Sequence, residues 1–162
     1  AAVLNRFYRD INNPDSIKYI EDGKEYYIKN AGSSKYITVS GNNIVQDSFQ
    51  QNDSQRFKVS KNFDGSFTLT PACSKKILSV KWNWKSFRFD NPKLSYSLIH
   101  SLSNYFKPVF CENGYFRIMT GLSKYTEVLN VQNSSQDNGA KIYCSMYDPD
   151  EMSSYWIFEE CQ

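Results

Sequence analysis

The sequence is poor in the residues that build several common functional sites. Its 162 residues include only 7 glycines, scattered singly, so it has no glycine-rich loop to cradle a phosphate. Its single histidine, His100, lies in the alternating stretch SLIHSL with no nucleophile or acid close to it in sequence. These shortages predict a protein that is not an enzyme and uses no cofactor.

Neither an excess of charge nor a long apolar run is present. There are 19 basic and 17 acidic residues, for a net charge of +2. Binding to nucleic acid depends on clustered Lys and Arg in excess, so we expect no nucleic-acid partner. No stretch reaches the roughly 18 consecutive apolar residues of a membrane-spanning helix, and we expect no transmembrane segment.

Cysteines are few but even in number, and none are spaced as C-x-x-C. Together with a single histidine, this spacing argues against a zinc site. At least one disulfide is expected if the protein is secreted, and we favour Cys144 with Cys161, which would tie the end of the chain to the preceding strands. Four buried free thiols are the alternative. The four candidates are Cys73, Cys111, Cys144 and Cys161.

Two N-x-[ST] sequons begin at Asn52 and Asn133, each within a polar loop. A glycan could be attached at either asparagine. Together with the even cysteine count, the sequons predict a secreted glycoprotein.

Internal repetition is the strongest positive feature. Each of three units begins with a short alternating strand, passes through a small polar turn into a second strand, and later ends at an aromatic residue. The first strands are expected at 26–28, 66–69 and 115–118, and the second at 36–39, 77–80 and 127–131. The closing aromatics are Phe57, Phe106 and Trp156, and we expect them to fill the core of the barrel.

A period near 50 residues with about four strands per unit predicts an all-β protein, a β-trefoil with little or no helix. Six strands would close a barrel and three hairpins would cap it, which hides the sheet edges. The trefoil domain is expected over residues 26–162, with repeats of about 26–65, 66–113 and 114–162. Residues 1–25 form an extension that could be a helical turn or an added strand.

This pattern resembles the repeat of the ricin-B-type lectins. The third unit carries it best, in YFRIMTGLSKY, LNV, SSQDNGAKIY and SSYWIFEE, and the resemblance covers about residues 26–160. It implies a secreted carbohydrate-binding module, a lectin or a toxin-attachment domain, whose partner is a glycan or glycoprotein.

The residues that hold galactose-type sugars in that family are largely missing. The family has a carboxylate in the middle of the second strand, an aromatic ring that stacks on the sugar, and amides that fix its register. The carboxylate position falls on Thr38, Ser79 and Asn130, none of them acidic. We therefore expect weak or absent galactose binding. If a sugar binds, we expect it in the third repeat, at Asn130, Tyr143 and Tyr147.

Other readings of the chain remain open. A β-trefoil can also be a protein-binding ligand or a protease inhibitor that acts through exposed loops, or a structural interaction domain. The stretch VKWNWKSFRF at 80–89 has aromatic residues on both faces of a strand. Core packing is the first expectation for these rings. An exposed patch that marks a partner site is the alternative.

Overall fold

The computed structural model describes residues 19–96 and 101–162. Most of the predicted extension 1–25 and His100 lie outside these residues. The described chain is almost entirely strand and turn, as predicted. Its elements are β1 (Glu25–Asn30), β2 (Tyr36–Ser40), β3 (Asn43–Asp47), β4 (Arg56–Lys61), β5 (Phe67–Pro71), β6 (Ile77–Ser79), β7 (Trp82–Asn83), β8 (Arg88–Phe89), β9 (Lys93–Ser95), η1 (Leu102–Asn104), β10 (Phe106–Phe110), β11 (Phe116–Thr120), β12 (Glu127–Val131), η2 (Gln132–Ser134), β13 (Ile142–Met146), η3 (Met152–Ser154) and β14 (Trp156–Glu160).

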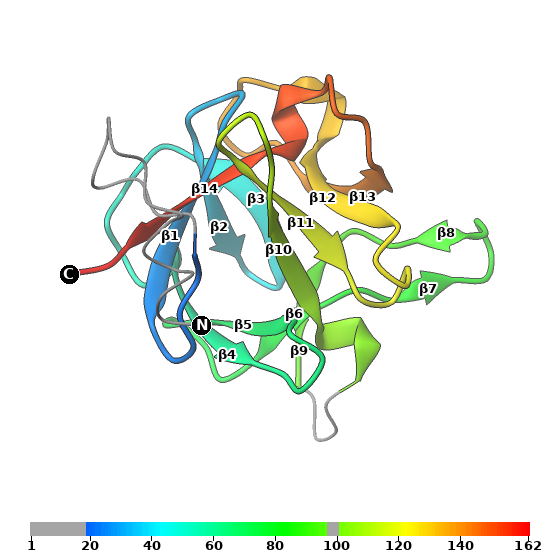
Figure 1. Cartoon of the computed structure of the whole chain (residues 1–162), viewed down its shortest axis with the longest axis horizontal. Helices are drawn as coiled ribbons and strands as arrows, with labels where there is room; N and C mark the ends of the chain where they lie inside the picture. The colour runs from blue at the N-terminus through cyan, green and yellow to red at the C-terminus, as the bar shows by residue number, and fades with distance from the viewer. Residues whose placement is uncertain (1–18, 97–100) are drawn as a thin grey trace.

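Strands β1, β4, β5, β10, β11 and β14 form a closed ring (Figure 1). Every neighbouring pair in the ring is antiparallel, and the ring closes where β14 pairs with both β11 and β1. Closure leaves no free edge in the barrel. The expected β-trefoil is thereby confirmed.

A hairpin belongs to each repeat: β2–β3 in the first, β6–β9 in the second and β12–β13 in the third. The second hairpin differs from the others. Between its two strands, the chain forms an additional small hairpin, β7–β8, which projects from the side of the barrel (Figure 1).

Equivalent side chains from the three repeats fill the barrel. The closing aromatics Phe57, Phe106 and Trp156 are all fully buried, as expected of core residues. The indole Nε1 of Trp156 donates to the carbonyl of Leu129 at 3.0 Å, which satisfies its polar atom inside the core. The threefold recurrence in the sequence therefore becomes threefold packing around one core.

The expectation of core packing for the aromatics of residues 80–89 is wrong for two of them. Trp84 and Phe87 are exposed, because the segment folds back on itself and leaves them in the connection between β7 and β8. Trp82 and Phe89 are half-buried and contact each other across the hairpin, with ring centroids 4.9 Å apart. In the part of the chain that is described, no helix is long and apolar enough to cross a membrane.

Candidate functional site

Asn130 lies on β12 directly opposite Tyr143 on β13, so the predicted pair is close in space. The Asn130 side chain, however, is fully buried. Its Nδ2 donates to Ser145 Oγ at 3.0 Å and to Glu151 Oε1 at 2.9 Å, while its Oδ1 has no hydrogen-bond partner. A sugar could reach Asn130 only if Glu151 and Ser145 moved aside.

Tyr147 has a different environment from Asn130. The guanidinium of Arg117 lies over its ring, 4.3 Å from the centroid, and its hydroxyl is 3.0 Å from that of Tyr155. Tyr155 donates in turn to the carbonyl of Pro149 at 2.8 Å. Burial and the bond to Tyr147 raise the pKa of Tyr155, which keeps this hydroxyl neutral. These residues line a cavity of about 440 Å³ that also includes Glu112 and Asn113.

The residues predicted for a third-repeat site therefore split into two environments. Asn130 and Tyr143 pair across the hairpin, whereas Tyr147 belongs to the cavity beside Arg117. The acid beside Asn130 is Glu151, which the sequence pattern indicates only as part of the turn Asp148–Pro149–Asp150–Glu151. The turn is formed, with the Asp150 amide donating to Asp148 Oδ1. No local spacing links Glu151 to a residue 21 positions earlier.

The family's acid positions in the other two repeats are also enclosed. Thr38 and Ser79 are both buried. Gln55 Nε2 donates to Thr38 Oγ1 at 3.0 Å and to the carbonyl of Ser48 at 2.8 Å, while its Oε1 accepts from the amide of Gln50. Gln55 is therefore a structural residue that holds its loop.

The first repeat presents an aromatic surface built from rings of three separate segments, β1, β2 and the residues after β3. The rings of Tyr27, Tyr36 and Phe49 form a cluster, here called the Phe49 platform. Phe49 lies 5.0 Å from Tyr27 and 4.9 Å from Tyr36 between ring centroids. The two tyrosines are buried, but Phe49 is 48% exposed. The Tyr36 hydroxyl donates to the carboxylate of Glu159, and burial together with this bond raises the pKa of Tyr36. The platform is thus a supported ring with a free surface.

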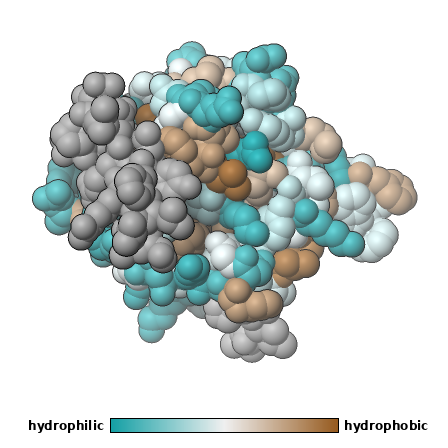
Figure 2. Space-filling model, viewed as in Figure 1, coloured by the Kyte–Doolittle hydropathy of each residue, from teal (hydrophilic) through white to brown (hydrophobic). Residues whose placement is uncertain are grey.

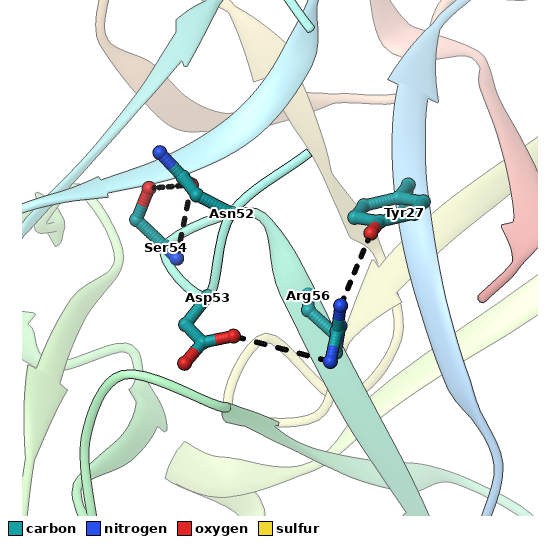
Figure 3. A network of polar contacts seen from close by, with 5 residues as sticks. All are labelled: Tyr27, Asn52, Asp53, Ser54 and Arg56. Carbon is teal, nitrogen blue, oxygen red and sulfur yellow. Dashed lines mark hydrogen bonds and ion pairs between the residues drawn. The ribbon is translucent and has the colours of Figure 1, made fainter. Parts of the chain in front are cut away.

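Polar side chains border the Phe49 platform. Arg56 lies between Tyr27, whose hydroxyl accepts from Nη2 at 3.5 Å, and Asp53, whose carboxylate is 3.9 Å from Nη1 (Figure 3). Asn52 Oδ1 accepts from both the amide and the hydroxyl of Ser54 (Figure 3). Its Nδ2 donates to Gln50 Oε1 at 3.0 Å. An exposed ring, a carboxylate and side-chain amides therefore occur together in the first repeat.

Gln50 and Asp47 extend this polar border towards β3. Gln50 Nε2 donates to Asp47 Oδ2 at 3.2 Å, at the end of that strand. Both Asp47 and Gln50 reach solvent, the former half-buried and the latter exposed. The two carboxylates, Asp47 and Asp53, are acceptors of the kind that sugar hydroxyls use.

At two equivalent positions of the first and third repeats, a tyrosine in one repeat corresponds to an arginine in the other. Tyr26 pairs with Phe57 in the first repeat as Phe116 pairs with Trp156 in the third. Tyr27 is therefore equivalent to Arg117, and Arg56 to Tyr155. In the first repeat Tyr27 contacts the ring of Phe49, and in the third repeat Arg117 lies over the ring of Tyr147. In both repeats the arginine Nε is buried without a partner. The Phe49 platform and the Tyr147 cavity are thus two versions of one position in the trefoil.

The predicted disulfide is not formed: Cys73, Cys111, Cys144 and Cys161 are all free thiols. Cys144 lies on β13, where its thiol is 3.8 Å from the carbonyl of Asp90, and Cys161 follows β14, where its amide bonds to Glu25 on β1. The two cysteines favoured as partners are therefore held by different parts of the fold.

The predicted glycosylation sites Asn52 and Asn133 are both exposed. Among residues 19–96 and 101–162, no group of three His, Cys, Asp or Glu side chains is arranged to hold a metal ion.

Comparison with known proteins supports the ricin-type β-trefoil fold. Residues 16–86 match the model of the family described as "Ricin-type beta-trefoil lectin domain-like". This range includes the Phe49 platform and the first repeat. Comparison with curated protein sequences finds no match.

Solved structures show the same fold at low sequence identity. A designed threefold-symmetric protein, ThreeFoil, has a TM-score of 0.71 at 21% identity, covering 85% of this chain and 99% of its own. The Macrolepiota procera ricin B-like lectin, solved with lactose, has a TM-score of 0.74 at 14% identity, covering 89% and 100%.

Part of a larger enzyme has a similar fold. The exo-beta-1,3-galactanase 1,3Gal43A from Clostridium thermocellum has a TM-score of 0.71 at 18% identity over 90% of this chain but only 32% of its own. The resemblance to ricin-B-type lectins is confirmed, and the fold is a β-trefoil shared by free-standing lectins and by parts of larger proteins.

Proposed function

We propose that this protein is a non-enzymatic, secreted carbohydrate-binding module of the lectin or toxin-attachment type, and that glycan binds at the Phe49 platform. The observation that carries the proposal is the half-exposed ring of Phe49, supported by Tyr27 and Tyr36. An aromatic face of this kind stacks on the apolar face of a sugar ring, and the polar groups around it fix the orientation of the sugar.

Charge and hydrogen-bonding capacity around the ring support the same assignment. Asp47 and Asp53 supply carboxylate acceptors, and Gln50 and Asn52 supply amides, all on the segment that surrounds Phe49. In the third repeat, by contrast, the side chain of Asn130 is fully buried, whereas Gln50, Asn52 and Asp53 are exposed to solvent. Because these polar groups stand at other positions than the family's, galactose-type sugars are expected to bind weakly.

Secretion is part of the proposal and rests on the two sequons alone, because the four free thiols remove the expected disulfide as support for it. Asn52 and Asn133 are exposed, as acceptors of a glycan must be. The non-enzymatic role rests on the sequence, whose only histidine is His100 and which has no recognisable nucleophile and base together.

The test is a glycan array followed by calorimetry with the strongest ligand. Phe49→Ala should lower the affinity about tenfold or more, because the stacking surface is removed. Phe63→Ala is a matched control, since Phe63 is 96% exposed in the turn between β4 and β5. It should bind as the wild type does.

Two further variants distinguish the repeats. Tyr147→Ala and Asn130→Ala should leave the affinity within about twofold, once their folding is verified. Loss of binding in these variants, with Phe49→Ala unaffected, would place the sugar in the third repeat. A silent array together with a tight protein partner would favour a β-trefoil ligand or protease inhibitor instead.

A further inference from the structure

The β7–β8 hairpin is an addition to the trefoil and has no counterpart among the hairpins of the first and third repeats described above. Trp82 pairs with Phe89 and Asn83 with Arg88, and the four residues between them form the tip. The hairpin projects away from the barrel in Figure 1. Because the hairpin projects in this way, its tip could contact a large flat surface without a clash from the barrel.

The tip is strongly apolar and held in shape. Trp84 is 77% exposed and Phe87 is 74% exposed. Figure 2 shows apolar residues gathered at the end of this projection. The Trp82 ring supports Trp84 from the base, with ring centroids 6.0 Å apart in an edge-to-face arrangement. Exposed apolar residues grouped in this way mark an interaction site.

The side chain of Asn83 and the backbone conformation of Phe87 shape the tip. Asn83 Oδ1 accepts from the amides of Lys85 at 2.9 Å and Ser86 at 3.2 Å. Phe87 has a positive φ of 52°, which is unusual for an aromatic residue. Strained backbone of this kind is retained where a particular side-chain direction is needed.

Cations surround the apolar tip. Lys81, Lys85 and Arg88 are all exposed on the hairpin. The nearest carboxylate in sequence, Asp90, accepts from Asn83 Nδ2 at 3.0 Å. Beside the base of the hairpin, a cavity of about 420 Å³ is lined by Arg88, Lys93 and Lys141 together with Asp90. Because the whole chain carries a net charge of only +2, this concentration of positive charge is local.

We propose that the β7–β8 hairpin is an interfacial anchor for anionic phospholipid membranes. Trp84 and Phe87 would enter the headgroup region, where aromatic side chains are favoured, while Lys85 and Arg88 remain among the anionic headgroups. The cavity at the base would take a phosphate or carboxylate of a headgroup through Arg88, Lys93 and Lys141. The charge complementarity favours an anionic bilayer as the occupant. This proposal is independent of the sugar site, because the hairpin and the Phe49 platform belong to different repeats.

The experiment measures binding to vesicles that contain no glycolipid, so its outcome is separate from that of the glycan test. Wild-type protein should sediment with phosphatidylcholine vesicles that contain about one third phosphatidylserine, and much less with pure phosphatidylcholine. Brominated lipid should quench its tryptophan fluorescence. Trp156 is fully buried, so the quenching reports on Trp82 and Trp84.

Two double variants and one control separate the contributions. Trp84→Ser with Phe87→Ser should lower the partition coefficient about tenfold or more, and Lys85→Gln with Arg88→Gln should lower it about tenfold on anionic vesicles alone. Phe63→Ser is the matched control, because it removes a ring that is 96% exposed elsewhere, and it should leave binding unchanged.

The proposal is wrong if the wild type does not bind anionic vesicles, or if the Phe63→Ser control loses as much binding as the Trp84→Ser, Phe87→Ser variant. It is also wrong if a soluble glycan or a protein partner protects Trp84 from an aqueous quencher while anionic vesicles do not.

Discussion

Asn130 Nδ2 donates to Glu151 Oε1 at 2.9 Å and so joins β12 to the turn that precedes η3. This bond brings a carboxylate to the position where ricin-B-type lectins have their own acid. The carboxylate comes from a different part of the chain, and a contact within the protein already uses it. At Asn130 the third repeat is therefore filled by the protein's own side chains, whereas Tyr147 lines a separate cavity.

Glu151→Ala should destabilise the protein by about 1–3 kcal/mol, because the buried Asn130 amide loses a charged acceptor. Urea unfolding would measure this loss as a lower midpoint with an unchanged slope. Asp150→Ala, at the exposed neighbouring position, is the control and should change little. If Glu151→Ala were as stable as the control, the bond would contribute nothing to the fold.

Asn130→Asp should not restore galactose-type binding, although it restores the residue type of the family. The new carboxylate would face Glu151, and two like charges at this distance repel each other. The variant should therefore be less stable than the wild type at pH 7 and regain stability as the pH falls and one of the two carboxyls takes a proton. Urea midpoints at both pH values, with lactose calorimetry, would check this; tight lactose binding by the variant would contradict it.

Thiol reactivity should follow burial. Burial raises the pKa of both thiols, that of Cys144 to about 12, but Cys73 is exposed to reagent in solution. At pH 8 an aromatic disulfide reagent should react with Cys73 first and with Cys144 only after unfolding, because the thiolate is the reactive form. Protein purified without reductant should show all four thiols once it is unfolded. Only two thiols would instead indicate a disulfide such as Cys144–Cys161.

Asp64 should make the free energy of unfolding decrease as the solution becomes acidic. Burial by itself would raise the pKa of Asp64, but hydrogen bonds from Ser66 and Tyr125 outweigh it and hold the pKa below its usual value of 3.8. A carboxyl whose pKa is lower in the folded state stabilises the fold above about pH 4, and this contribution is lost as the pH falls through the folded value.

Asp64→Asn should therefore be less stable than the wild type at pH 7, and the difference should shrink towards pH 2. Urea unfolding at several pH values would measure it, with Asp150→Asn as an exposed control. Parallel curves for the wild type and Asp64→Asn would show that the hydrogen bonds to Asp64 do not stabilise its charge.

Gly121→Ala should be strongly destabilising. A Cβ at this position would lie 2.7 Å from the carbonyl oxygen of Leu102 and 2.9 Å from that of Tyr105, and backbone atoms cannot easily move aside. We expect a loss of about 1–3 kcal/mol in the free energy of unfolding. Gly32→Ala, whose Cβ would lie 3.2 Å from the amide of Ser153, should cost less. Thermal unfolding of the two variants would test this order, and equal melting temperatures would contradict it.

The sequence by itself determined the β-trefoil. Strand alternation is a local property, because successive side chains point to opposite faces, and its threefold recurrence left few ways to bury the apolar faces. The buried closing aromatics Phe57, Phe106 and Trp156 were predicted for this reason. The absence of acids at Thr38, Ser79 and Asn130 could also be read directly from the residues.

Only the tertiary structure decided where the functional surfaces lie. The contact of Glu151 with Asn130, the support of Phe49 by Tyr27 and Tyr36, and the exposure of Trp84 and Phe87 all depend on loop paths and on strands that are distant in sequence. The separate environments of Cys144 and Cys161 arise in the same way. A local pattern specifies which face of a strand is apolar, but the packing of non-neighbouring segments determines which side chains meet and which remain in solvent.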